Sequence, residues 1–265
     1  MRNMLKKLND VKCFLLDMDG TFYLGEEILE GSMEFLAHLK ETGRDFMFLT
    51  NNSSRSAKMS VEKLAKMGVF IEDRQMFTSG QATALLLNDT YPGKRIYLLG
   101  NAALRGEMLE MGVNIVENDA EMVVVGFDTE LTYEKMWRTC DLVRDGLPYL
   151  CTHPDFNCPT ETGFMPDAGA ILAFIEASTG RRPDLIVGKP YPPIVEATLL
   201  RTGLTKQELC IVGDRLYTDI KTGVDSGILS ILVLTGETKQ EDIAPSPTKP
   251  DLTFERLSSM IEHLQ

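Results

Sequence analysis

The sequence predicts an α/β protein with a Rossmann-like parallel sheet. Short apolar runs alternate with amphipathic stretches along most of the chain, which is typical of βαβ units. Several of these runs end in polar residues that can do chemistry, namely Asp17, Thr50, Lys189 and Asp214. Because open α/β sheets bind ligands beyond the carboxyl ends of their strands, this recurrence predicts one shared site.

The expected strands are apolar runs bounded by turn residues. The first run leads directly into Asp17 and is read as a buried parallel strand. The expected strands are residues 12–17, Phe46–Leu49, Ile96–Leu99, a segment near Ile115, Met122–Val125, Tyr149–Cys151, Leu185–Val187, Leu209–Val212 and Ile231–Leu234.

Helices are expected between the strands, where apolar residues recur at helical spacing. Gly43 and Gly68 stand where helix-ending glycines belong, and Ser53 and Ser54 are expected to cap the second helix. The expected helices are Gly31–Lys40, Arg55–Met67, Gly80–Leu87, Ala102–Met111, Tyr133–Val143, Ala170–Ser178, Ile194–Thr202, Leu216–Asp225 and one near Phe254–His263.

The chain is expected to form two parts. A break at Tyr91-Pro92-Gly93 precedes a segment with its own alternation of strands and helices. We therefore expect a core made of residues 1–78 and 186–265, with an inserted α/β cap over residues 79–185. Leu185–Val187 is expected to resume the core sheet.

Composition excludes several classes of protein. The formal net charge of −12 disfavours nucleic-acid polymers, which need a basic surface. Apolar residues make up 43% of the chain, too many for a disordered protein, and no apolar run approaches the roughly 20 residues of a membrane span. No export signal is recognised at the N-terminus, so we expect a cytoplasmic protein without a membrane partner.

The five cysteines show no disulfide or metal-motif spacing. Cys13 and Cys210 lie inside apolar runs, which favours buried free thiols in a reducing cytoplasm. Cys151, His153 and Cys158 are close in sequence but lack a fourth ligand, so a structural zinc site is disfavoured.

Asp17 and Asp19, together with the distant Asp214, are candidates for a metal site. Crowded carboxylates repel one another unless a cation lies between them, and Mg²⁺ takes carboxylate oxygens, carbonyls and water as ligands. Gly20 permits a bend that would let both side chains reach past the strand end, and Asp19 could bind through its backbone carbonyl. One aspartate could attack phosphorus while the other transfers protons.

A carboxylate that attacks an anionic phosphate needs positive charge nearby. Lys189 and the metal ion are the candidates for this charge. The backbone N–H groups of Thr50 and Asn51 precede an expected helix and suit the phosphate oxygens. These residues together predict a phosphoryl-transfer site.

Four polar segments follow apolar runs in a fixed order along the chain. They are Asp17-Met18-Asp19-Gly20-Thr21, Thr50-Asn51-Asn52-Ser53, Gly188-Lys189-Pro190 and Gly213-Asp214-Arg215-Leu216-Tyr217-Thr218-Asp219. The combination resembles the motifs of the haloacid dehalogenase superfamily of phosphotransferases. The matching segments lie in the core, between residue 12 and about residue 234.

The resemblance implies roles for the acidic residues. Asp17 would be the nucleophile, and Asp19 the acid that protonates the leaving oxygen and the base that activates water. Mg²⁺ would be held by Asp17, the carbonyl of Asp19 and Asp214, with Asp219 supporting these ligands. Beside the metal ligands this chain has Tyr217, where a small acidic or amide residue is expected.

The resemblance also implies how the substrate is held. Thr50, Asn51 and Asn52 would bind the phosphate, and Lys189 would neutralise it. The insertion is similar to the large α/β cap of class IIA members, the NagD-like, 4-nitrophenylphosphatase-like and pyridoxal phosphate phosphatase-like proteins. The cap loop Thr152–Gly169 would close over the leaving group, with three residues placed to choose among substrates: His153, Asp155 and Asn157.

The expected function is hydrolysis of a small phosphorylated metabolite, such as a nucleotide, a sugar phosphate, phosphoglycolate or pyridoxal phosphate. Caps of this type sometimes pair, so a homodimer through the cap is among the expectations. A phosphoryl transferase or mutase of the same fold is one alternative. A non-catalytic phosphate-ligand sensor is another, although binding alone would need neither Asp17 as nucleophile nor Asp19 as proton shuttle.

Overall fold

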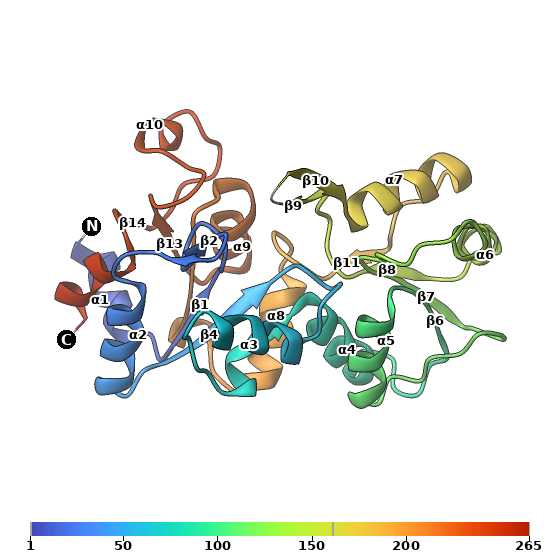
Figure 1. The fold of residues 1–265 in the computed structure, drawn as a ribbon, viewed down its shortest axis with the longest axis horizontal. Coiled ribbons are helices and arrows are strands. Elements are labelled where there is room, and N and C mark those ends of the chain that lie inside the picture. Colours follow the sequence, from blue (N-terminus) through green and yellow to red (C-terminus); the bar gives the residue numbers. More distant parts are fainter. Residues whose placement is uncertain (1, 161, 265) are drawn as a thin grey trace.

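Two parallel sheets covered by helices organise the chain (Figure 1). The computed structural model describes residues 2–160 and 162–264. The larger sheet lies on the side of the molecule where the chain begins and ends, and the smaller sheet lies on the other side. The α/β class and the parallel-sheet core predicted from the sequence are confirmed.

The larger sheet contains six parallel strands in the order β14-β13-β12-β1-β4-β5. β1 lies inside this sheet and every residue in it is buried, as expected for a strand covered on both faces. The strands are β1 (Cys13–Leu16), β4 (Asp45–Thr50), β5 (Met76–Thr78), β12 (Leu209–Gly213), β13 (Leu229–Val233) and β14 (Leu252–Phe254).

Alternate residues of these strands face two separate hydrophobic clusters. Phe14 and Leu16 of β1 pack with α1, α2 and α3, whereas Cys13 and Leu15 pack with α4 and α8 on the opposite face. Helices therefore cover both faces of the sheet, as in a doubly wound fold. The helices are α1 (Arg2–Asp10), α2 (Ser32–Glu41), α3 (Ala57–Lys66), α4 (Ser79–Thr90), α8 (Pro193–Thr202), α9 (Lys221–Ser226) and α10 (Gln240–Ile243).

Short helical turns complete this part of the chain. A π-helical turn over Leu216–Ile220 runs directly into α9, and single 3₁₀ segments lie at Asp73–Gln75, Lys206–Glu208 and Leu257–His263. A small hairpin of β2 (Tyr23–Leu24) and β3 (Glu27–Ile28) follows β1. Among the described residues, no helix has the length and apolarity needed to cross a membrane.

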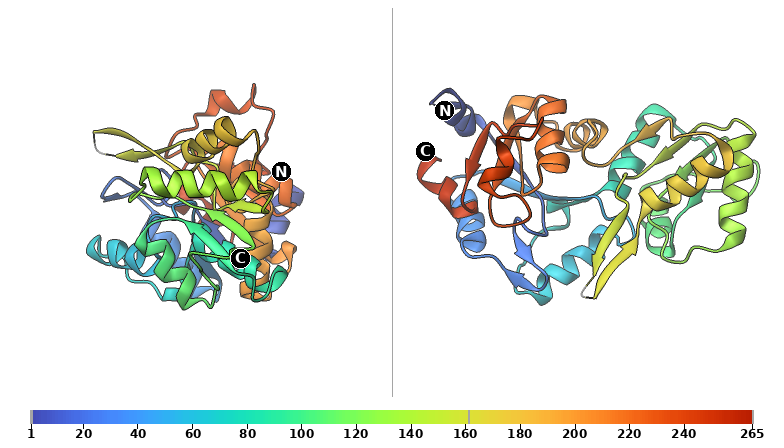
Figure 2. Two further views of the ribbon diagram at one scale, coloured as in Figure 1. Left: turned by 90° about the vertical axis from the view of Figure 1, so that its right-hand side faces the viewer. Right: turned by 90° about the horizontal axis from the view of Figure 1, so that it is seen from above.

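The smaller sheet is also parallel, in the order β11-β8-β7-β6. α6 and α7 cover one face, and α4 and α5 cover the other (Figure 2). The elements are β6 (Ile96–Leu99), β7 (Met122–Val125), β8 (Tyr149–Cys151), β11 (Leu185–Ile186), α5 (Ala102–Glu110), α6 (Tyr133–Arg144) and α7 (Ala168–Thr179).

Helix α4 belongs to the hydrophobic clusters of both sheets. Ala82 and Leu86 pack with the larger sheet, while Ala84 and Leu87 pack with the smaller one. Beside α4, the buried Glu107 on α5 accepts hydrogen bonds from the Ala57 backbone N–H at 2.6 Å and from the Thr78 hydroxyl at 2.9 Å. Apolar packing and a buried carboxylate therefore join the two parts.

The strand at residues 185–187 lies in a different sheet from the expected one. β11 pairs with β8, so the prediction that it resumes the core sheet is wrong. The error has a physical reason, because an apolar run fixes that a segment is a strand but not which distant strand it pairs with.

Two local predictions are also corrected. Ser56 caps α3 and accepts a hydrogen bond from the Met59 N–H, whereas Ser53 and Ser54 were the expected caps. The cap loop contains an antiparallel hairpin, β9 (Asn157–Thr160) and β10 (Gly163–Pro166), that the sequence analysis missed. Its side chains are mostly exposed, so no apolar alternation marks it.

Candidate active site

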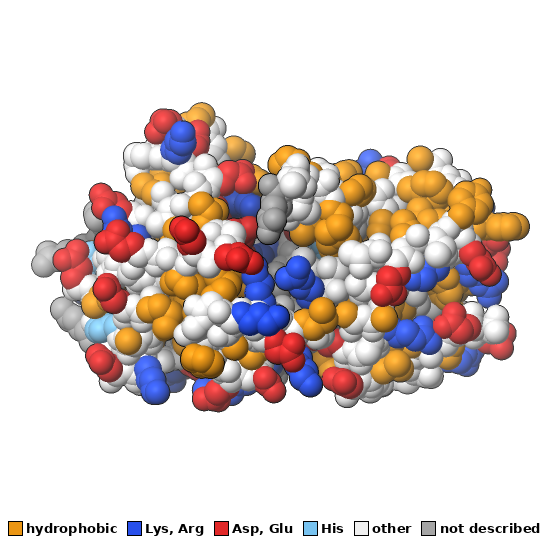
Figure 3. All heavy atoms as spheres, viewed as in Figure 1, with side chains coloured by type: hydrophobic (Ala, Val, Ile, Leu, Met, Phe, Trp, Pro, Cys, Tyr) orange, Lys and Arg blue, Asp and Glu red, His pale blue; other side chains and the backbone are white. Residues whose placement is uncertain are grey.

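A cavity of about 730 Å³ lies between the carboxyl ends of β1 and β4 and the β9–β10 hairpin. Figure 3 shows basic side chains gathered at the hollow between the two parts of the molecule. The predicted site residues that line the cavity are Asp17, Asp19, Thr50, Asn51, Asn52, Asp155, Asn157, Lys189 and Asp219. Asp214 lies beside Asp17 and Asp219, whereas His153 is not part of the lining.

The chain turns sharply where β1 ends. Gly20 has a φ of +85°, and a Cβ on this residue would lie only 2.5 Å from Oδ2 of Asp214. Glycine therefore lets Asp214 approach the end of β1. In the same turn, Oδ1 of Asp19 is buried and has no hydrogen-bond partner among the described residues, which leaves it available to a ligand.

Lys189 joins two carboxylates at the base of the cavity. Its ammonium Nζ lies 2.5 Å from Oδ1 of Asp17 and 2.7 Å from Oδ1 of Asp219. Asp17, Asp219 and Asp214 each place a carboxylate oxygen within 4.8 Å of the others. The buried ammonium of Lys189 thus lies beside three carboxylates. Together these carboxylates carry enough negative charge to bind a second cation.

Burial and mutual repulsion shift the protonation of these groups. Burial, together with the charges of Asp219 and Asp214, raises the pKa of Asp17 to about 7, since the opposing effect of Lys189 is smaller. Burial, followed by the charge of Asp219, also raises the pKa of Asp214. For Lys189, burial alone would lower the pKa, but Asp17 and Asp219 together raise it, so the lysine stays charged.

The metal-free protein is expected to lose stability as the pH rises from 3.8 to about 7. Over this range the unfolded chain releases the Asp17 proton while the folded protein retains it, which favours unfolding. Urea denaturation in EDTA at several pH values measures the slope. Asp17→Asn, which lacks the titrating group, should show a shallower fall, and equal slopes in the two proteins would contradict the raised pKa.

Asn51 uses its whole side-chain amide to connect three segments. Its Oδ1 accepts a hydrogen bond from the Lys189 backbone N–H at 2.8 Å, and its Nδ2 donates to the Lys189 carbonyl and to Oδ2 of Asp155. A Cβ on Gly188 would lie 2.6 Å from Oδ1 of Asn51, so glycine is needed for this close approach. The contact fixes the Lys189 backbone beside the loop after β4.

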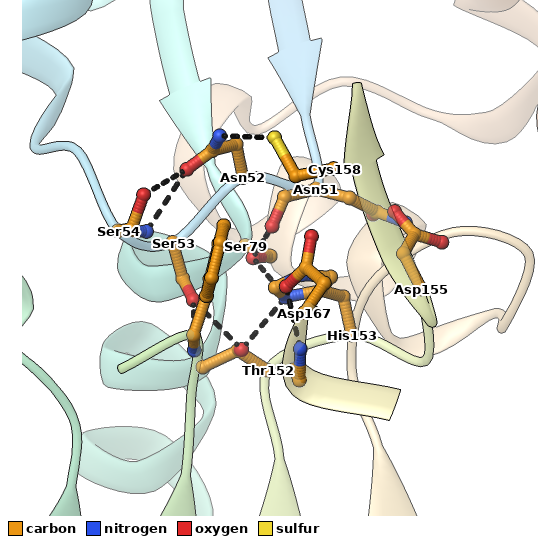
Figure 4. A network of polar contacts seen from close by, with 12 residues as sticks. Asn51, Asn52, Ser53, Ser54, Ser79, Thr152, His153, Asp155, Cys158 and Asp167 are labelled. Carbon is orange, nitrogen blue, oxygen red and sulfur yellow. Dashed lines mark hydrogen bonds and ion pairs between the residues drawn. The ribbon is translucent and has the colours of Figure 1, made fainter. Parts of the chain in front are cut away.

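His153 lies in a buried polar network rather than in the cavity (Figure 4). Its Nε2 is 2.8 Å from Oδ1 of Asp167, and its Nδ1 is 2.9 Å from the hydroxyl of Thr152. Thr152 is in turn 3.0 Å from the hydroxyl of Ser53. His153, two residues after β8, thus connects its own segment to the start of α7 and, through Thr152, to the loop after β4.

Replacing His153 with Leu is expected to lower the free energy of unfolding by roughly 1–3 kcal/mol, because Asp167 would lose a buried partner. Urea denaturation at neutral pH measures this change. His263→Leu, at a partly exposed position near the C-terminus, serves as the control and should have little effect. Equal stabilities of the two variants would contradict the structural importance of the network.

Tyr217, noted from the sequence beside the metal ligands, lines the cavity and donates a hydrogen bond to Glu237 at 3.0 Å, and Arg215 of the same segment pairs with that carboxylate. Other residues that line the cavity were missed in the sequence analysis. Arg55 directly follows the segment Thr50–Ser54, a signal that could have suggested it. The remaining residues line the cavity because of how distant elements pack, which no local signal predicts. They are Tyr23, Lys63, Phe156, Phe164 and Tyr191.

The fold and the cavity define a class of capped hydrolases that act at the carboxyl edge of a parallel sheet. The chain belongs to the haloacid dehalogenase-like hydrolase family. The family model of that description matches residues 14–114, and a related HAD-hydrolase-like model matches residues 186–260.

Relatives cover almost the whole chain. An acid sugar phosphatase from Staphylococcus aureus is 35% identical over 260 residues, which cover 97% of this chain and 100% of that protein. The solved 4-nitrophenylphosphatase from Thermotoga maritima is 48% identical, with a TM-score of 0.93 and coverage of 98% and 99%. NagD from E. coli K-12 is 32% identical, with a TM-score of 0.87 and coverage of 94% and 97%. The chain is a phosphoric monoester hydrolase of the class IIA, NagD-like group.

Proposed function

We propose that the chain is a Mg²⁺-dependent phosphatase that hydrolyses a small phosphomonoester through an aspartyl-phosphate at Asp17. One observation carries this proposal. The ammonium of Lys189 holds Asp17 at the base of the cavity, while the unpartnered Oδ1 of Asp19 lies in the same turn. The proposed nucleophile Asp17, the positive charge of Lys189 and the proposed proton carrier Asp19 thus lie together.

The donor set fits Mg²⁺, because a hard cation prefers carboxylate and carbonyl oxygens. Asp17, Asp214 and the backbone carbonyl of Asp19 would hold the ion. Asp219 accepts a hydrogen bond from Lys189, as Asp17 does, and is proposed to support these ligands. When bound, the ion supplies positive charge that reduces repulsion between the phosphate and Asp17.

The proposed reaction has two steps. A carboxylate oxygen of Asp17 attacks phosphorus, the ester P–O bond breaks, and Asp19 gives its proton to the leaving alkoxide. Asp19, now ionised, takes a proton from water, whose oxygen attacks the aspartyl-phosphate and releases inorganic phosphate. Thr50, Asn51 and Asn52 are proposed to hold the phosphate, Asn51 through its backbone N–H because its side-chain amide bonds to Lys189 and Asp155. Lys189 is proposed to balance the phosphate charge.

The position of the β9–β10 hairpin favours small substrates, because it stands over the cavity from the side of the smaller sheet. We propose that residues 79–185 act as the cap and that Asp155 and Asn157, which line the cavity, contact the leaving group. His153 would act indirectly, through the loop that carries Asp155. Small phosphorylated metabolites are the proposed partners.

Phosphate release from a panel of phosphomonoesters tests the proposal. The panel contains 4-nitrophenyl phosphate, nucleotides, sugar phosphates, phosphoglycolate and pyridoxal phosphate, each with Mg²⁺ and with EDTA. Release that requires Mg²⁺ is expected. Transfer to an added alcohol instead of water would favour a mutase, and tight binding without turnover would favour a sensor.

A further inference from the structure

Four basic residues line the cavity, and they fall into two pairs: Lys189 with Arg215, and Arg55 with Lys63. Lys189 and Arg215 each form an ion pair with a carboxylate. Among the described residues, Arg55 and Lys63 form none, although acidic residues outnumber basic ones by 39 to 27 in this chain. Two cations on one cavity wall therefore lack an acidic partner.

Lys63 is held in place by an aromatic side chain. Its Nζ lies 3.2 Å from the hydroxyl of Tyr23 and 4.4 Å from the centre of the Tyr23 ring. Tyr23 is itself buried beside the turn that carries Asp19. The ammonium is therefore fixed on the side of the cavity formed by α3 and the turn after β1, rather than free in solvent.

The surroundings of Lys63 disfavour its charge in the absence of a ligand. Burial and the nearby charge of Arg55 lower its pKa by more than Asp19 and Glu26 raise it. An anion placed between Arg55 and Lys63 would relieve this repulsion.

Three of the carboxylates that line the cavity, Asp155, Asp167 and Glu237, are already engaged elsewhere. Asp155 accepts a hydrogen bond from an amide, Asp167 is bonded to a histidine, and Glu237 accepts from a tyrosine hydroxyl. None of the three forms an ion pair with Arg55 or Lys63. The charge of Asp19 acts on Lys63 without an ion pair between the two side chains, so a negative charge in contact with Lys63 and Arg55 is best supplied by a ligand.

We infer that Arg55 and Lys63 form a second anion subsite, which binds a carboxylate or a second phosphate carried by the leaving group of the substrate. The inference rests on the proposed phosphatase function, in which Lys189 serves the transferred phosphoryl group. It narrows the substrate class to small phosphomonoesters with a second anionic group.

Matched ester pairs test the subsite. Phosphoglycolate is compared with 2-hydroxyethyl phosphate, and a sugar bisphosphate with its monophosphate. For at least one pair, kcat/KM is expected to favour the doubly anionic ester by about tenfold, and this preference should weaken with added salt. The pair that shows the preference identifies the carboxylate or the phosphate as the group bound.

Variants on α3 and in the loop just before it separate the subsite from general charge effects. Arg55→Gln and Lys63→Gln are each expected to reduce the preference by about tenfold, mainly through KM, while Lys63→Arg keeps most of it. Lys58→Gln removes the same charge from an exposed position of α3 outside the cavity and should keep the full preference. Circular dichroism checks that each variant is folded.

Two results would overturn the subsite: no preference in either ester pair, or a preference that survives in both glutamine variants. A protein that releases phosphate from no ester would contradict the proposed function instead. The subsite is then tested by calorimetry on the Asp17→Asn protein, where phosphoglycolate or the bisphosphate should bind about tenfold more tightly than its matched ester. Equal dissociation constants in that measurement would also overturn it.

Discussion

Asp17→Asn is expected to reduce phosphate release by about 10⁴-fold or more while the protein remains folded. An amide of nearly the same shape cannot attack phosphorus, so the covalent step is lost. Removing one negative charge also reduces repulsion with Asp214 and Asp219, so stability at neutral pH should not fall. Stopped-time phosphate assays measure the first effect, and thermal melts followed by circular dichroism measure the second.

Asp89→Asn is the matched control for this experiment, because Asp89 is exposed on α4 and does not line the cavity. Its activity should equal that of the unchanged protein. Residual activity above about 1% in Asp17→Asn would argue against a covalent intermediate on this residue.

Lys189→Met is expected to lower kcat by about 10²–10³-fold and to move the acidic limb of the pH–rate profile to higher pH. The substitution removes the only cation bonded to Asp17 among the described residues, so the pKa of Asp17 should rise. A larger fraction of Asp17 would then be protonated at neutral pH and unable to attack.

Lys221→Met provides the comparison for this change. Lys221 pairs with Asp225 on the exposed surface of α9, where an ion pair contributes little. Its pH–rate profile should match that of the unchanged protein. An acidic limb that stays in place in Lys189→Met would show that Lys189 does not control the ionisation of Asp17.

Much of the fold could be predicted because buried parallel strands have continuous apolar sequences. The runs at β1, β4, β7 and β8 identified these strands within one residue or two. β5 has only three residues, too few for a clear pattern. The partner of β11 depends on how distant segments pair, which no local pattern records.

The candidate site was predictable in part for a similar reason. Residues at the ends of neighbouring parallel strands converge whatever the details of packing, so Asp17 after β1 and Thr50 at the end of β4 could be grouped from sequence. Lys189 follows β11 of the smaller sheet, and its contact with Asn51 could not be predicted in this way. The burial of His153 could not be predicted, because it depends on Asp167, which reaches it from the start of α7. Lys63 likewise enters the cavity only because of the direction in which α3 packs.

The double attachment of α4 limits how this enzyme can be recombined. Its residues fill gaps in both hydrophobic clusters, and Glu107 bonds to the beginnings of α3 and α4. A chimera that takes residues 79–185 from another family member would also take that protein's α4. The face of this helix that packs on the larger sheet would then have to fit the larger sheet of the recipient protein. Exchange of substrate preference between relatives should therefore succeed more often when only the β9–β10 hairpin is transplanted, since that hairpin reaches the cavity without contributing to either sheet.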